Sequence, residues 1–173
     1  HSSRDDALIH DWRTRVADEH QPPEYQRQAL LLLPCSAVKP YRTSQSHRRF
    51  LRSIGSDAVH QVMVTAPLGL VPRELEEIWP AANYDIPVTG EWDADELKVI
   101  RDMLSHLVHR VGYSRVINHS GIDIELQGVE CVDTRLGDSA GSAEALMRLQ
   151  EEVVRVSSEL SLQSPPRPAH RLA

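Results

Sequence analysis

A thiol, an amine and an imidazole fall in one short stretch of the chain, at Cys35, Lys39 and His47. A cysteine thiolate is a nucleophile, and a neighbouring cation or helix start lowers the pKa of a thiol. A lysine amine can be tuned to titrate, and histidine is the commonest general acid or base. These residue types predict nucleophilic catalysis with Cys35 as the attacking group. An inert buried thiol and a capping or surface histidine are the alternatives that the residues leave open.

Tyr41 and Ser44 lie between these groups, and arginines gather around them although the net charge of the 173-residue chain is −6. Tyr41 either packs in the core or stacks on a base, and Ser44 either binds a substrate or caps the following helix. No acidic residue occurs between Tyr41 and Ser53. We predict a local phosphate-binding patch, made of Arg42, Arg48, Arg49 and Arg52.

The elements that must position these groups alternate between short apolar strands and amphipathic helices. Strands are expected at 29–33, 61–66, 115–118 and 129–133, with a further short strand at 86–89. Helices are expected at 5–19, 46–54, 94–111 and 142–160, with one or two helical turns from Pro72 within 71–78. This alternation predicts an α/β fold, a three-layer α/β/α sandwich with a mostly parallel central sheet.

Ligands bind beyond the carboxyl ends of the strands in such sheets. Cys35 follows the first strand, Pro67 and Gly69 follow the second, and Asn118 and His119 end the third. A tight turn at Pro67 and Gly69 would present backbone N–H groups to an anion or a base edge. We predict that Pro67, Gly69, Asn118 and His119 bind the substrate, together with Asp85. An ordinary strand-to-helix connection, a turn-forming Asp85 and a structural His119 remain the alternatives.

Length and composition favour one domain at 1–160, with an N-terminal helix at 1–22, a core at 29–160 and a disordered proline-rich tail at 161–173. No apolar run is long enough to span a membrane, and two cysteines make no disulfide framework, so we expect a cytoplasmic protein with free thiols. Phosphate-binding glycine motifs and a C-x-x-C pair are missing from the sequence. We therefore expect no cofactor and no metal.

The segment "PCSAVKPYRTSQSH" matches the pattern P-C-x3-K-P-Y-x2-S-x2-H at every fixed position. This pattern resembles the core motif of archaeosine synthases, the relatives of archaeal tRNA-guanine transglycosylases. "VMVTAPLGLVPRELE" and "YDIPVTGEW" are similar to the next two blocks of that family, so the resemblance covers about residues 30–92.

The resemblance implies a tRNA substrate that carries 7-cyano-7-deazaguanine and a reaction that adds an amine to its nitrile. Lysine, glutamine-derived ammonia or ammonia would be the amine donor, and no ATP would be needed. Cys35 would form a covalent thioimidate, Lys39 would lower the thiol pKa or position the amine, and His47 would deliver a proton. Asp85 would bind the edge of the deazaguanine.

Members of that family usually carry a transglycosylase-like domain and a PUA domain, so we expect either an excised core or a shorter relative that needs a partner enzyme. Two other functions stay open. The layout also resembles uracil-DNA glycosylases, which implies their fold and a base-processing activity, although Lys39 stands where those enzymes place an aspartate. The other is a non-catalytic domain that binds RNA or a partner.

Overall fold

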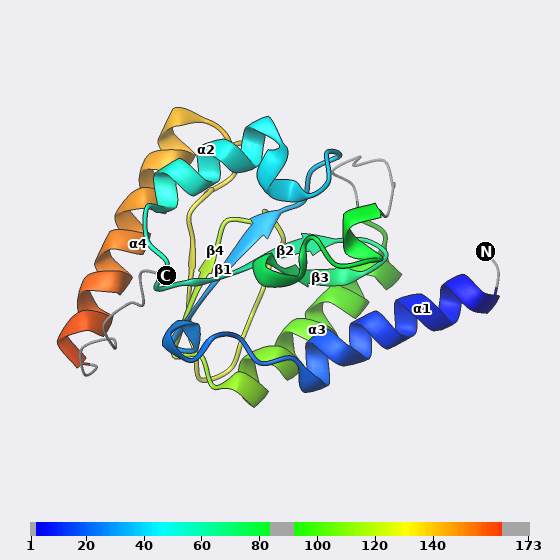
Figure 1. Ribbon diagram of the computed structural model, residues 1–173. Coiled ribbons are helices and arrows are strands. Elements are labelled where there is room, and N and C mark those ends of the chain that lie inside the picture. Colours follow the sequence, from blue (N-terminus) through cyan, green and yellow to red (C-terminus); the bar gives the residue numbers. More distant parts are fainter. Residues whose placement is uncertain (1–2, 84–91, 164–173) are drawn as a thin grey trace, which may run out of the picture.

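The computed structural model describes residues 3–83 and 92–163, and Figure 1 shows their arrangement. One five-stranded sheet has the order β3-β2-β1-β4-β5. The strands β1, β2, β4 and β5 run parallel, and β3 is antiparallel to β2. The strands are β1 (Ala29–Pro34), β2 (His60–Thr65), β3 (Gly69–Pro72), β4 (Arg115–Asn118) and β5 (Glu130–Asp133). The helices are α1 (Ser3–Thr14), α2 (Gln45–Ile54), α3 (Ala94–Val111) and α4 (Ala143–Gln163).

The helices form two layers, with α2 and α4 over one face of the sheet and α1 and α3 over the other (Figure 1). The central strand β1 is therefore covered on both sides, and its residues Ala29–Leu33 are fully buried. A strand that is covered on both faces has a continuous run of apolar residues, and the sequence ALLLL at 29–33 is such a run. The predicted α/β fold with a mostly parallel sheet and helices on both faces is confirmed.

The helical turns predicted to start at Pro72 do not start there, because residues 71 and 72 belong to a strand. The chain forms the edge strand β3 at Gly69–Pro72 and makes only a short 3-10 turn, η4, at Arg73–Leu75. Gly69 has a φ of +87°, and a Cβ there would lie 2.3 Å from the Met103 sulfur of α3. Glycine therefore permits the close return of β3 along β2, and Pro72 is tolerated because it ends an edge strand.

The predicted bounds of the other described elements are close to the observed ones. The helix α3 begins with a capping box at Asp93 and Glu96, and the left-handed Gly112 follows its last residue. The helix α4 runs to Gln163, three residues beyond its predicted end and into the segment expected to be disordered. The strand predicted at 86–89 lies outside the described residues. Within the described residues, no helix is long and apolar enough to cross a bilayer.

Candidate functional site at the carboxyl ends of β1 and β2

Cys35 follows the last residue of β1 and lies beside the end of β2, because Pro34 pairs with Val64 in the sheet. Hydrogen bonding from the Thr65 side chain and the charge of Lys39 both act on the pKa of the Cys35 thiol. Burial raises the pKa of the Cys35 thiol, while Thr65 and Lys39 act in the opposite direction. The half-buried sulfur thus has a hydroxyl and an ammonium group as its polar neighbours.

Lys39 and Tyr41 line the same corner. Lys39 Nζ donates a hydrogen bond to the Ser36 carbonyl at 2.8 Å and lies 5.1 Å from the centre of the Tyr41 ring. Tyr41 is only 1% exposed, and its hydroxyl forms a hydrogen bond with Thr65. Burial raises the pKa of Tyr41, so the phenol stays protonated. In this structure Tyr41 packs in the core, the first of its two alternatives, and Thr65 links it to Cys35.

His47 is fully buried, and the fold uses both of its ring nitrogens. Its Nε2 donates to the Pro34 carbonyl at 2.7 Å, and its Nδ1 accepts from Arg73 Nη2 at 3.0 Å. Burial first, and then the charge of Arg73, lowers the pKa of His47 to about 3. The neutral ring fixes the carbonyl that precedes Cys35, so the geometry favours a positioning role over proton delivery. Ser44 is the N-cap of α2 and accepts from the His47 backbone N–H at 3.1 Å.

Behind His47 lies a buried ion pair that the sequence reasoning missed. Glu76 is 2% exposed, and its carboxylate accepts from the Arg42 backbone N–H at 2.9 Å and from Arg73 Nη1 at 3.4 Å. Arg73 also donates to the Gln61 side chain at 2.9 Å. A continuous chain of polar contacts therefore runs from Glu76 through Arg73 and His47 to Pro34, the residue before Cys35. We call this chain the Glu76–His47 relay.

Pro67 and Gly69 lie at the same end of the sheet but make other contacts. The Pro67 carbonyl accepts from Arg13 Nε of α1 at 2.8 Å, and Gly69 packs against Met103. Both contacts are on the side of the sheet covered by α1 and α3. Asp85, the predicted reader of the base edge, lies outside the described residues.

Asn118 is the last residue of β4, and His119 follows it beside β1, where the His119 N–H donates to the Leu32 carbonyl at 2.9 Å. Both side chains are buried and bonded within the fold. Asn118 Nδ2 donates to the Ile122 carbonyl at 2.7 Å, and His119 Nε2 donates to the Ala140 carbonyl at 2.8 Å. The Thr134 hydroxyl forms a hydrogen bond with His119 Nδ1 at 2.7 Å, and burial lowers the pKa of the His119 ring. These contacts favour the structural alternative for His119.

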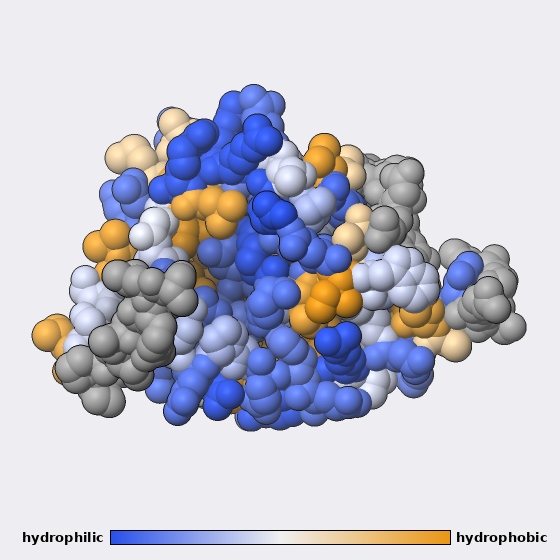
Figure 2. Space-filling model, viewed as in Figure 1, coloured by the Kyte–Doolittle hydropathy of each residue, from blue (hydrophilic) through white to orange (hydrophobic). Residues whose placement is uncertain are grey.

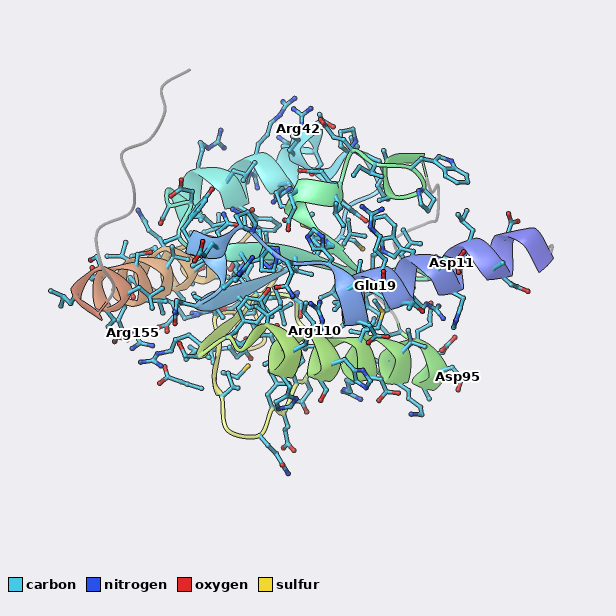
Figure 3. The ribbon with its side chains drawn as sticks, turned by 60° about the horizontal axis from the view of Figure 1, so that its bottom comes forward. Asp11, Glu19, Arg42, Asp95, Arg110 and Arg155 are labelled. Carbon is cyan, nitrogen blue, oxygen red and sulfur yellow. The ribbon has the colours of Figure 1, made fainter. Side chains whose placement is uncertain are left out.

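The four predicted phosphate-binding arginines are exposed, but they are not equivalent. Arg42 forms an ion pair with Glu77, which is also exposed. No carboxylate of the described ranges 3–83 and 92–163 pairs with Arg48, Arg49 or Arg52. Strongly hydrophilic side chains cover the surface over α2 in Figure 2, and Arg42 points outward in Figure 3. Arg48, Arg49 and Arg52 are hereafter the α2 arginines.

The architecture is that of an α/β domain, and Cys35 is the centre of its candidate site at the carboxyl ends of β1 and β2. The chain belongs to the family described as "Domain of unknown function (DUF5591)", whose model matches residues 9–153.

Curated relatives carry names that concern archaeosine. The chain is 39% identical over 162 residues to the archaeosine synthase subunit alpha of Methanosarcina acetivorans, a match that covers 87% of this chain and 25% of that protein. It is 48% identical over 90 residues to the archaeosine synthase of Haloferax volcanii, covering 52% of this chain and 15% of that protein. The chain thus spans a quarter or less of the length of these two relatives.

Among solved structures, the chain is similar to AF0587, a protein of unknown function, with a TM-score of 0.62 and 24% sequence identity. The match covers 82% of this chain and 49% of that one. At this identity the likeness concerns the fold alone.

Proposed function

We propose that this chain carries the amine-adding site of an archaeosine-synthase-like enzyme, which acts on the nitrile of 7-cyano-7-deazaguanine in tRNA. The observation that carries the proposal is the placement of Cys35 at the end of β1, in contact with Thr65 and near Lys39. The printed names of the relatives from Methanosarcina acetivorans and Haloferax volcanii support the substrate class. The family model, which matches residues 9–153, spans the motif that holds Cys35, Lys39 and His47.

In the proposed reaction, the Cys35 sulfur bonds to the nitrile carbon and one π bond of the C≡N group breaks. The thiol proton, passed through a neighbouring group, ends on the nitrile nitrogen and gives a thioimidate. An amine then attacks the same carbon, the C–S bond breaks, and the thiol regains a proton as the amidine forms. No atom is lost overall, and no ATP or redox cofactor is required. The covalent step divides one difficult addition into two easier ones.

Lys39 is the group of this corner that we propose to carry the proton between sulfur and nitrogen. Its ammonium is held beside Cys35 by the Ser36 carbonyl and the Tyr41 ring. Thr65 orients the thiol, and the Glu76–His47 relay positions the end of β1. Asp85 remains the proposed reader of the base edge, and lysine, glutamine-derived ammonia or ammonia remains the proposed amine donor.

The direct test is intact mass spectrometry of the protein mixed with 7-cyano-7-deazaguanine, both as the free base and within tRNA. We expect a mass gain equal to the whole nitrile compound on the wild-type chain and none on Cys35→Ala. Cys131→Ala is the matched control, because Cys131 is a free thiol on β5 whose pKa is likewise raised by burial. This control should retain the adduct.

Incubation of the tRNA form with lysine, glutamine or ammonia should add the mass of one amine to the RNA and identify the donor. An adduct retained in Cys35→Ala would contradict the proposal. A tRNA complex that forms without any adduct or amine addition would instead favour a non-catalytic RNA-binding domain.

We propose that the α2 arginines contact tRNA phosphates, aided by further domains or a partner chain. Replacing Arg48, Arg49 and Arg52 together with glutamine should weaken tRNA binding and reduce the slope of log affinity against log salt by about 2 to 3, since each lost phosphate contact removes about 0.7 to 0.9. Filter binding at several salt concentrations measures this slope. Arg155→Gln is the control, because Arg155 of α4 is already paired with Glu130, Glu152 and Glu159. An unchanged slope in the triple variant would remove α2 from the RNA interface.

A further inference from the structure

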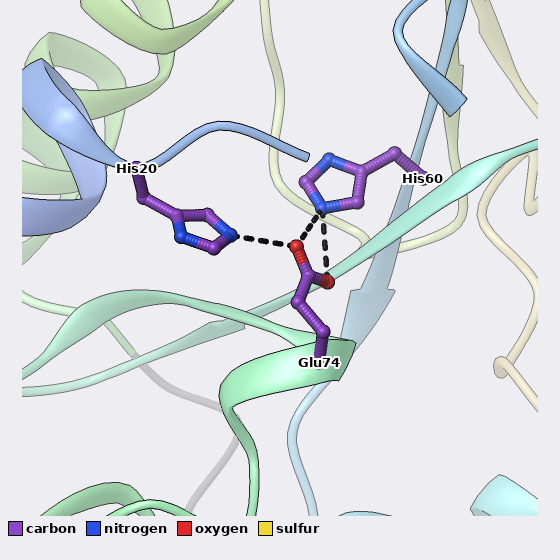
Figure 4. Close-up of side chains that lie close together, drawn as sticks. All are labelled: His20, His60 and Glu74. Carbon is purple, nitrogen blue, oxygen red and sulfur yellow. Dashed lines mark hydrogen bonds and ion pairs between the residues drawn. The ribbon is translucent and has the colours of Figure 1, made fainter. Parts of the chain in front are cut away.

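His20, His60 and Glu74 form a compact cluster at the opposite end of the sheet from Cys35 (Figure 4). His60 is the first residue of β2, while Thr65, which contacts Cys35, is the last. Five residue steps of about 3.3 Å along β2 place the two positions roughly 16 Å apart. His20 directly follows the π-helical turn Arg15–Glu19 that continues α1, and Glu74 lies in η4. Three segments that are distant in the sequence therefore meet at one point.

The three side chains converge through their ligand atoms. His20 Nε2 lies 2.7 Å from Glu74 Oε2, and His60 Nε2 lies 2.8 Å from the same oxygen and 3.1 Å from Oε1. All three ligand atoms lie within 4.8 Å of one another. The His60 side chain is fully buried, whereas those of His20 and Glu74 are 14% and 28% exposed. The cluster is thus closed toward the core and open on one side to solvent.

We infer that His20, His60 and Glu74 bind a divalent transition-metal ion of the zinc type. Two imidazoles and one carboxylate are a common protein ligand set for zinc, with water in the fourth position. Imidazole suits zinc and its neighbours in the first transition series, whereas magnesium and calcium prefer oxygen ligands. The open side between His20 and Glu74 admits that water.

The separations of the three groups suit such an ion after a small opening. Tetrahedral ligands about 2.0 to 2.1 Å from zinc lie roughly 3.3 Å apart. The separations of the His20 and His60 nitrogens from the Glu74 oxygen, 2.7 and 2.8 Å, must therefore each widen by about 0.5 to 0.6 Å. The partly exposed side chains of His20 and Glu74 can make this adjustment without moving the buried ring of His60.

Contacts outside the cluster hold two of the ligands in place. His60 Nδ1 lies 2.5 Å from the Tyr113 hydroxyl, which fixes the ring so that Nε2 faces the cluster. A ligand histidine usually has its other nitrogen bonded in this way. Arg110 of α3 donates to the backbone carbonyls of Val16, Ala17 and His20, and so fixes the chain that carries His20. Figure 3 shows Arg110 near Glu19, at the end of this N-terminal segment.

An ion here would fasten the N-terminal helical segment to β2 and η4. A metal that binds the folded chain and not the unfolded chain stabilises the fold by an amount that grows with the logarithm of its concentration over the dissociation constant. The cluster lies far from the Cys35 corner, so the ion would take no part in the chemistry proposed there. The inference is independent of the proposed function: it concerns other residues, and its test requires no nitrile or tRNA.

The test is titration of the metal-free chain with Co²⁺, followed by visible absorption, and with Zn²⁺, followed by calorimetry and thermal unfolding. We expect one ion per chain, a cobalt spectrum without thiolate charge-transfer bands, and a higher midpoint of unfolding with Zn²⁺. His20→Ala and Glu74→Gln should each weaken the affinity by at least about tenfold and abolish the thermal shift. The control is His106→Ala, because His106 is exposed, pairs with Asp18 and belongs to no group of three ligands among the described residues. It should bind as the wild type does.

Three results would overturn the inference. The first is the absence of one-to-one binding in the wild-type chain. The second is binding that stays unchanged in both His20→Ala and Glu74→Gln. The third is a thiolate band, which would place the ion at Cys35 or Cys131. Circular dichroism of the metal-free variants at the start of each titration confirms that they are folded, so a loss of binding reports the ligands themselves.

Discussion

Replacing Glu76 with alanine should lower the free energy of unfolding by about 3 to 5 kcal/mol, as expected when one partner of a buried ion pair is removed. The reason is that Arg73, largely buried, would keep its charge without a counter-ion. Burial already lowers the pKa of the Arg73 guanidinium, and Glu76 is the carboxylate that opposes this effect. The Arg42 backbone N–H would also lose its acceptor. Urea unfolding measured at neutral pH gives the change directly.

The next residue along the chain supplies a matched control. The Glu77 side chain is 57% exposed and pairs with Arg42, which is 54% exposed. Exposed ion pairs contribute little, so Glu77→Ala should change the stability by no more than about 1 kcal/mol. Equal losses in the two variants would show that the Glu76–His47 relay does not carry the stability we assign to it. Glu76→Gln keeps an acceptor for the Arg42 N–H but loses the charge. Its loss of unfolding free energy should therefore lie between those of Glu76→Ala and Glu77→Ala.

The arrangement of the sheet follows from patterns that the sequence displays openly. Ala29–Leu33 is an unbroken apolar run because helices cover both of its faces, and Asp93 with Glu96 marks the start of α3 by a local hydrogen-bond pattern. The edge strand β3 was missed because Pro72 suits a first helical position as well as the end of an edge strand. It pairs with β2 as a hairpin across residues 66–68, and strand formation depends on such pairing and packing more than on the intrinsic propensity of its residues.

The candidate site was predictable at Cys35 and Lys39, where several reactive types crowd one loop, but not in its surroundings. Thr65 is an unremarkable strand residue until the register of β1 and β2 places it beside Cys35. Arg73 and Glu76 look like an exposed pair three residues apart, and only the fold buries them. His20, His60 and Glu74 are too far apart in the sequence to match any ligand spacing. Side chains gathered by tertiary structure carry no local signal.

The histidine of the motif should make the stability of the chain depend on pH in a way that a substitution can isolate. His47 has a pKa of about 3 in the folded chain, and an unfolded histidine titrates near 6.5. Between these two pKa values, His47 binds a proton in the unfolded chain but not in the folded chain. The contribution of neutral His47 is complete above about pH 6.5 and is lost as the pH falls toward 3, at about 1.4 kcal/mol per pH unit.

Between pH 7 and pH 5 this amounts to about 2 kcal/mol, and comparing urea unfolding of the wild type with His47→Gln at both values measures it. Glutamine can donate to the Pro34 carbonyl and accept from Arg73, yet it does not titrate. The wild type should thus lose about 2 kcal/mol more than the variant. His119, whose pKa burial also lowers, contributes equally to both proteins and cancels from the difference. Equal losses would mean that His47 becomes protonated within the fold, which would return it to the role of proton donor beside Cys35.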